Sequence, residues 1–253
     1  MKLIADTHLH VYPFYDVGTA MRHLAANLSG LCPGATRAAF LVERADCDWF
    51  AALGTGEASP VPGFRVEQCG EAGAAILKEE DGEPIYVFAG RQFVTAERVE
   101  VLSLAATPAV EAGRVARDVV EEVLVAGGVP VLAWAPGKWF FQRGTVVRNV
   151  MAEFGPRVLV GDTSLRPTIW PEPALMAGAA TVLAGSDPLP FAGEERYFGR
   201  YASIIDCDFD YARPVASIRA ALTSGKAEVT RCGQRCGVLD VVRRVALNAR
   251  AAG

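Results

Sequence analysis

Short apolar segments alternate with helical segments along most of this chain, and this alternation constrains the fold more than any other feature. Strands are predicted at residues 2–6, 37–42, 98–104, 129–134, 157–161 and 181–185. Helices are predicted at residues 18–27, 111–126, 145–154, 172–179, 217–224 and 237–250. Strands that alternate with helices usually pair in parallel and close toward a barrel. The sequence therefore predicts an α/β fold, a distorted or incomplete TIM-like (β/α) barrel.

Residues 63–90 interrupt this alternation. Three segments, 63–69, 74–78 and 84–89, have the pattern of antiparallel strands, and the acidic run at 79–83 supplies a hairpin turn between the last two. The segment is too short to hold a core of its own. We therefore expect one barrel-like domain over residues 1–253, with a small antiparallel β-hairpin insert at about 63–90.

Composition narrows the classes of protein to consider. Hydrophobic residues make up 51% of the chain and charged residues 21%, which is typical of a globular protein with a packed core. The net charge of -4, without a basic block, predicts no nucleic-acid partner. Apolar runs stay far below the roughly 18 residues of a membrane span, so no membrane partner is expected. Six scattered cysteines and no export signal favour reduced thiols and a cytoplasmic protein.

Two of the three histidines lie in one tripeptide just after the first predicted strand. Because side chains on a strand alternate between faces, Asp6, His8 and His10 are expected to point the same way. Two imidazoles on one face can reach a single metal ion, with a carboxylate behind them. The alternative is that both are ordinary surface or turn histidines. The third histidine, His23, lies in the first helix and is expected to be structural.

Further ionisable residues follow the other predicted strands. In α/β barrels the functional residues gather at the carboxyl ends of the strands, which here carry Glu43, Asp162 and Asp187. Asp187 follows the apolar strand at 181–185, where a carboxylate can bind a metal ion and accept a proton from water. The alternative is an aspartate that caps a turn before Pro188.

The early Asp-x-His-x-His and the late Gly-Ser-Asp together resemble the amidohydrolase superfamily and the related PHP (polymerase and histidinol phosphatase) family. The resemblance implies a barrel that binds one to three divalent metals and activates water, with His8 and His10 as ligands and Asp187 as ligand or base. A PHP protein normally has a histidine two residues after this aspartate, where this chain has Leu189. The remaining ligands are therefore expected among the carboxylates Glu43, Asp46 and Asp162. Such nitrogen and oxygen donors suit Zn, Mn or Fe.

Residues 134–144 form an aromatic loop with two cations. A glycine turn carries Lys138 past a strand end, and Arg143 follows. Both could hold an anionic group beside an aromatic wall. Alternatively, the segment is a surface loop whose aromatics pack on a helix or a second copy of the chain, as in a homo-oligomer.

Two later segments carry weaker signals. Residues 191–201 mix charges with aromatics, which fits either a lid over a site or a solvated helix face. The last predicted helix has an apolar face of six residues: Val238, Leu239, Val241, Val242, Val245 and Leu247.

Together these patterns predict a metal-dependent hydrolase. His8, His10 and Asp187 would hold a divalent ion, with Glu43 or Asp162 completing the site. Asp187 would act as general base for attack by water on a small anionic amide, ester or phosphoester, and Lys138 and Arg143 would orient this small-molecule substrate. The alternative is a catalytically decayed barrel that acts as a ligand-binding protein.

Overall fold

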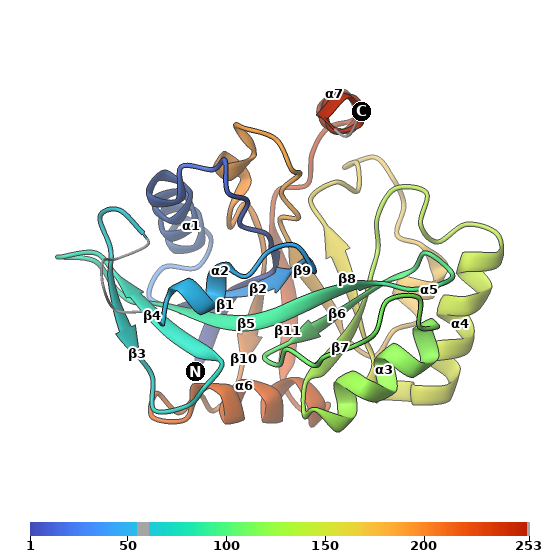
Figure 1. Ribbon diagram of the computed structural model, residues 1–253, viewed down its shortest axis with the longest axis horizontal. Helices are drawn as coiled ribbons and strands as arrows, with labels where there is room; N and C mark the ends of the chain where they lie inside the picture. The colour runs from blue at the N-terminus through green and yellow to red at the C-terminus, as the bar shows by residue number, and fades with distance from the viewer. Residues whose placement is uncertain (55–60, 252–253) are drawn as a thin grey trace.

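The computed structural model describes residues 1–54 and 61–251 and contains one mixed sheet with eleven strands (Figure 1). The strands are β1 (Lys2–Leu9), β2 (Thr36–Glu43), β3 (Arg65–Gln68), β4 (Ala74–Lys78), β5 (Ile85–Val94), β6 (Glu100–Leu104), β7 (Val129–Ala133), β8 (Leu159–Thr163), β9 (Val182–Gly185), β10 (Tyr201–Asp206) and β11 (Glu228–Gly233). The helices are α1 (Val17–Leu31), α2 (Trp49–Ala52), α3 (Ala116–Val125), α4 (Gln142–Phe154), α5 (Ala174–Ala177), α6 (Pro214–Thr223) and α7 (Val238–Ala251), with 3-10 turns η1 (Gly155–Arg157) and η2 (Glu194–Tyr197).

The sheet curves until β9, the strand at one end of its order, lies against β1. Its order is β11-β10-β1-β2-β5-β6-β7-β8-β9. The Thr7 hydroxyl on β1 donates to the Ala184 carbonyl on β9 at 3.0 Å. A Cβ at Gly185 would lie 2.4 Å from the backbone nitrogen of His8, so only glycine permits this approach of β9 to β1. The nearly closed sheet confirms the predicted distorted TIM-like barrel.

The strand directions differ from the predicted all-parallel arrangement. β1, β2 and β5 are parallel to one another, and so are β7, β8 and β9, whereas β6 is antiparallel to both of its neighbours. Only residues 95–99 join β5 to β6, which is too short for a crossover connection. Two strands, β10 and β11, were not predicted. β11 has the mixed polarity of an edge strand, and β10 lacks a clear alternation of apolar and polar residues.

The segment predicted as a β insert divides into two parts. β3 and β4 form a hairpin that pairs antiparallel with β5. β5 itself lies between β2 and β6 and is a strand of the barrel wall. The addition to the barrel is therefore the β3–β4 hairpin, and the third strand expected at 84–89 belongs to the wall.

The barrel interior is packed, and one end of it is closed. Inward-facing side chains from most strands form a single core, which includes Leu3, Phe40, Phe88, Val131 and Leu183. On the far side of this core, α6 adds Val215, Ile218 and Leu222, so this helix covers the end where β1 begins (Figure 1). The opposite end, where β1, β2 and β9 finish, is left for polar side chains.

The last helix does not bury the apolar face expected from the sequence. Leu239 is 85% exposed and Val242 61% exposed, whereas Arg244 is only 2% exposed. α7 stands apart from the sheet in Figure 1, and its inward contacts come from Val241 and Arg244. Among the described residues, no helix is both long and apolar enough to cross a membrane.

Candidate metal centre

A β-bulge in β1 aims the two histidines into the barrel mouth. Three steps along β1, from Asp6 to Leu9, match two steps along β2. Ile4 before the bulge and Leu9 after it both pack outside the barrel against α1. Asp6 shares the outer face with Ile4, whereas His8 and His10 alternate with Leu9 and face inward. The expectation that all three point the same way is therefore wrong, because the extra residue reverses the alternation.

Both imidazoles converge with the carboxylate of Asp187. The Nε2 atoms of His8 and His10 lie 3.1 Å apart, and Oδ1 of Asp187 is 3.5 Å from the first and 3.8 Å from the second. The three residues form a cluster whose ligand atoms all lie within 4.8 Å of one another. This cluster could hold a metal ion.

The chemistry of these donors fits a divalent metal ion. Burial, reinforced by the neighbouring His8, lowers the pKa of His10 well below its usual value, so its imidazole is neutral, as a ligand must be. Burial raises the pKa of Asp187, and a cation beside it would offset that effect. Nδ1 of both imidazoles is buried without a hydrogen bond to the described residues, whereas the two Nε2 atoms converge on the Asp187 carboxylate and are therefore placed to bind an ion.

Asp6 braces the cluster from outside the barrel. Its carboxylate accepts hydrogen bonds from the backbone amides of Ser186 at 2.9 Å and Gly199 at 2.9 Å, and from the Ser186 hydroxyl. It also accepts from the His8 amide at 3.2 Å. Full burial raises the pKa of Asp6 to about 6 despite these bonds. Asp6 therefore ties β1 to the segment that carries Asp187.

Asp187 holds an uncommon backbone conformation. Its φ of 49° lies in the left-handed region, which costs a non-glycine residue on the order of 1 kcal/mol or more. Its amide donates to the His8 carbonyl at 2.9 Å, which fixes it beside the histidines. Such conformations cluster at functional sites, where surrounding contacts hold them in place.

Glu43 lies at the end of β2, but on the outer face. Val42 belongs to the barrel interior, so alternation turns Glu43 outward. Its carboxylate accepts hydrogen bonds from the amides of Trp49 and Phe50 and thereby caps α2. The nearby Asp46 pairs with Arg44 at 3.3 Å. Neither carboxylate belongs to the described three-residue cluster.

Asp162 also faces outward, because its neighbour two positions earlier, Val160, packs in the outer core under α3 and α4. Its carboxylate is fully buried and is bound by two arginines and one tyrosine. Arg166 forms a two-pronged ion pair at 2.6 and 2.7 Å. Tyr201 donates its hydroxyl at 2.8 Å, and Arg231 approaches to 3.1 Å. These partners neutralise Asp162, which the structure does not bring to the histidines.

The two cations of the aromatic loop have separate partners. Lys138 forms an ion pair with Glu100 at 3.0 Å, whereas Arg143 donates to the carbonyl of Gly137 in its own loop at 2.6 Å. Trp139 is buried and donates to the Ala133 carbonyl. The structure therefore gives Arg143 a role in shaping the loop and places Lys138 beside a carboxylate.

Two polar residues near the cluster were not anticipated from the sequence. Gln92 of β5 brings its side-chain oxygen to 3.2 Å from Nε2 of His8. The carboxylate of Glu100, which opens β6, is close enough to raise the pKa of Asp187. Glu100 was predicted as an ordinary strand residue, and Gln92 fell between the strands predicted at 84–89 and 98–104. The pairing of β5 with β6 that brings both to the rim has no local signature in the sequence.

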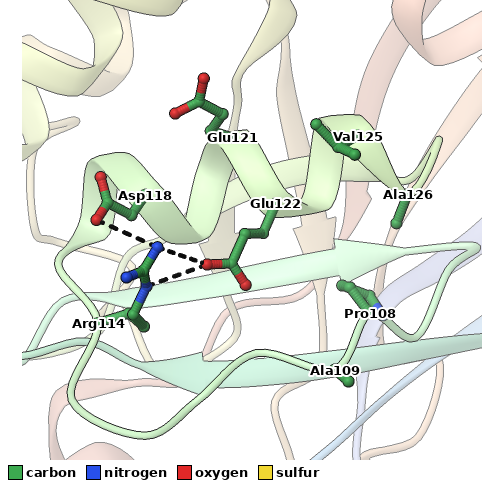
Figure 2. A pocket seen from close by; sticks show the side chains of 8 residues that line it. All are labelled: Pro108, Ala109, Arg114, Asp118, Glu121, Glu122, Val125 and Ala126. Atoms are coloured by element: carbon green, nitrogen blue, oxygen red, sulfur yellow. Dashed lines mark hydrogen bonds and ion pairs between the residues drawn. The ribbon is translucent and has the colours of Figure 1, made fainter.

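Gln92 and Glu100 also line a cavity of about 830 Å³ beside the cluster. Arg44, Arg91 and Arg114 contribute cations to its wall. A second hollow of about 460 Å³ lies between α3 and residues 108–114 (Figure 2). There Arg114 pairs with Asp118 at 3.5 Å and Glu122 at 3.0 Å, so its charges are mutually neutralised. Of these two hollows, the larger one adjoins the candidate metal centre through Gln92.

Comparison with known proteins shows the fold. No family model and no curated protein sequence matches the chain. PsfC from Pseudomonas syringae PB-5123 superposes with a TM-score of 0.55 and 14% identity, over 99% of this chain and 97% of that one. The lesion-specific endonuclease PfuEndoQ from Pyrococcus furiosus gives a TM-score of 0.55 at 12% identity, over 92% of this chain but only 59% of that one. Endonuclease Q bound to a 27-mer duplex with an abasic lesion gives 0.51 at 12% identity, over 96% and 67%.

The last of these structures overturns one expectation from composition. A net charge of -4 was taken to predict no nucleic-acid partner, yet a protein of this fold holds a DNA duplex as substrate. Net charge sums over the whole surface, whereas a nucleic acid responds to the local field around the site it occupies. The exclusion is therefore wrong.

Proposed function

We propose that this protein is a metal-dependent hydrolase of the amidohydrolase and PHP type that cleaves phosphoester bonds, with a nucleic-acid strand as its substrate. The observation that carries the proposal is the convergence of His8, His10 and Asp187 within 4.8 Å at the mouth of a barrel. The fold shared with endonuclease Q, which is named as a lesion-specific endonuclease, supports the choice of a phosphodiester.

In this proposal His8 and His10 would hold the ion through Nε2, and Asp187 would hold it through Oδ1. A bound Zn, Mn or Fe ion would act as a Lewis acid and lower the pKa of water. Asp187, with one oxygen turned to the histidines, would accept the proton from the attacking water with its other oxygen. Glu43 and Asp162, predicted as ligands, are left out because each is bound by other partners.

The chain's own residues would also hold the substrate. Gln92 and Glu100 connect the centre to the cavity of about 830 Å³, whose Arg44 and Arg91 could contact phosphate groups. Lys138 stays a candidate for substrate binding, because its ion pair with Glu100 places it at the same rim. Arg143 is less suited, since its guanidinium binds its own loop.

The test combines metal analysis with hydrolysis. Purified protein would be compared with a His8→Ala/His10→Ala variant and with His23→Ala, a matched control at the exposed third histidine. We expect about one equivalent or more of Zn, Mn or Fe, absent only from the double variant. Cleavage would be followed on an abasic-site duplex, an undamaged duplex and bis(p-nitrophenyl) phosphate. If the double variant retains both its metal and its hydrolysis, the proposal is wrong.

A second candidate is a catalytically decayed barrel that binds a ligand. It is favoured by the small size of the cluster, since the described residues offer one group of three ligands. It predicts ligand binding in the larger cavity without turnover of any phosphoester. Metal content without hydrolysis, on duplexes and on small phosphoesters alike, would favour this candidate.

A further inference from the structure

Residues 186–199, which make up nearly all of the segment between β9 and β10, include Asp187 and are fixed at three places. Asp6 accepts hydrogen bonds from the amides at their two ends, Ser186 and Gly199. Their middle part contains η2, whose Glu194 is fully buried. A solvated helix face was one of the two interpretations of this segment. The burial of Glu194 contradicts it, because this carboxylate has an inward partner.

That partner comes from the far end of the chain. Arg244 on α7 donates from Nε to both oxygens of Glu194 at 3.0 and 2.9 Å. Glu194 in turn accepts from the amide of Leu189 at 3.0 Å, two residues after Asp187. The ion pair thus reaches directly into the stretch of backbone that holds the proposed metal ligand.

The same guanidinium touches Asp187 itself. Nη2 of Arg244 donates to the Asp187 carbonyl at 3.4 Å, and Nη1 donates to the Ser164 hydroxyl at 3.2 Å. The guanidinium also lies 4.1 Å from the centre of the Tyr197 ring. One buried side chain therefore contacts the segments after β8 and β9 and the turn η2.

The rest of α7 contributes little to docking. Val238, Leu239, Val242 and Val245 are all exposed, and the small apolar cluster at this contact consists of Tyr197, Cys236 and Val241. A buried charge costs desolvation, so apolar packing alone would hold a helix at lower cost. An arginine adds directed hydrogen bonds in several directions, which apolar contacts lack.

We propose that Arg244 is a positioning residue for the metal centre. Through Glu194 and the Asp187 carbonyl, α7 holds residues 186–199 so that Asp187 keeps its left-handed backbone and its carboxylate faces His8 and His10. The consequence for metal binding rests on the proposed function, whereas the fixing of the backbone does not. The position of the C-terminal helix and the geometry of the centre therefore depend on each other.

The test uses variants that separate positioning from folding. Arg244→Lys keeps a charge but loses the fork of the guanidinium. Glu194→Met/Arg244→Met removes both charges at once, so no lone buried charge destabilises the fold. Arg243→Ala is the matched control on the exposed side of the same helix.

Two readouts are needed. In metal-free protein, hydrogen exchange at the amides of Asp187 and Leu189 should speed up in both Arg244 variants, while exchange in β2 and β5 stays as in the parent. Titration with Zn or Mn should show affinity weakened by about 10- to 100-fold, the usual effect of losing a residue that orients a metal ligand. Arg243→Ala should change neither.

Parent-like exchange at Asp187 in the folded double variant would overturn the positioning role, as would parent-like metal affinity. If the double variant does not fold, Arg244→Lys decides by the same two criteria. A parent protein that binds no metal would instead refute the proposed function, and the exchange comparison would still decide whether Arg244 fixes the segment.

Discussion

Asp162 and Asp187 lie at or near the carboxyl ends of neighbouring strands of one barrel and have opposite surroundings. Asp162, near the end of β8, is fully buried and is bound by Arg166, Arg231 and the hydroxyl of Tyr201. Asp187, after β9, faces two imidazoles, and Arg244 donates to its backbone carbonyl. The first carboxylate is neutralised by protein cations, whereas the second is left to attract an external one.

The difference arises from which face of the sheet each residue occupies. Asp162 lies within its strand on the outer side, where Val160 packs beneath the helices. Asp187 lies just beyond its strand, where a left-handed residue turns the chain across the barrel mouth. A carboxylate near the end of a strand can therefore have either a structural or a catalytic role. The side chains that surround it determine which of the two it has.

The largest effect is expected from Asp162→Ala. It leaves Arg166 buried without its carboxylate, which typically costs about 3–5 kcal/mol of stability. Urea unfolding should show a strong drop in midpoint, and Asp162→Asn, which keeps two hydrogen-bonding atoms, should lose less. The folded fraction should bind metal as the parent does. A stable variant that lost only its metal would mean that Asp162 is a ligand after all.

Asp187→Asn should have the opposite profile. The free energy of unfolding of the metal-free protein should stay within about 1 kcal/mol of the parent value, because no protein cation loses its partner. Metal affinity should fall by about 100-fold or more, beyond the range typical of residues that only orient ligands. Isothermal titration with Zn or Mn measures this loss. A variant that is strongly destabilised, yet binds metal with the parent's affinity when folded, would reverse the comparison between the two aspartates.

Much of this pattern was accessible from the sequence because the signals are local. The alternation of strands and helices predicted the barrel, and the motifs around His8, His10 and Asp187 identified the residues that the structure gathers within 4.8 Å. Asp6 was placed on the wrong face, because a one-residue bulge in β1 leaves no trace in an apolar strand.

The remaining parts depend on long-range pairing. Glu43 and Asp162 were expected at the centre because a strand's period of two does not reveal which face is inward. Gln92 was missed because the strand predicted at 84–89, taken as part of an insert, ended before it, whereas β5 continues to Val94 and pairs with β2 in the barrel wall. Arg244 was missed because a buried arginine on an amphipathic helix cannot be recognised before its partner, Glu194, is known.

Gln92→Leu should weaken metal binding by about tenfold, because the side-chain oxygen of Gln92, 3.2 Å from His8 Nε2, would lie beside an ion held by that nitrogen and is lost. Gln92→Glu offers an oxygen in the same place and should restore most of the affinity. Competition titration with a chromogenic chelator resolves a difference of this size. If the parent and Gln92→Leu bind metal with equal affinity, Gln92 lines the cavity but does not contribute to metal binding.

Glu43→Ala should have the smallest effect. Its carboxylate accepts from the first amides of α2, and a lost cap costs about 1 kcal/mol. The unfolding midpoint in urea should shift accordingly, and Glu43→Gln, which keeps an acceptor oxygen, should recover part of the loss. Metal content should equal that of the parent in both variants, since Glu43 points away from the barrel mouth. Loss of metal with unchanged stability would place Glu43 at the centre and show that its outward orientation changes when an ion binds.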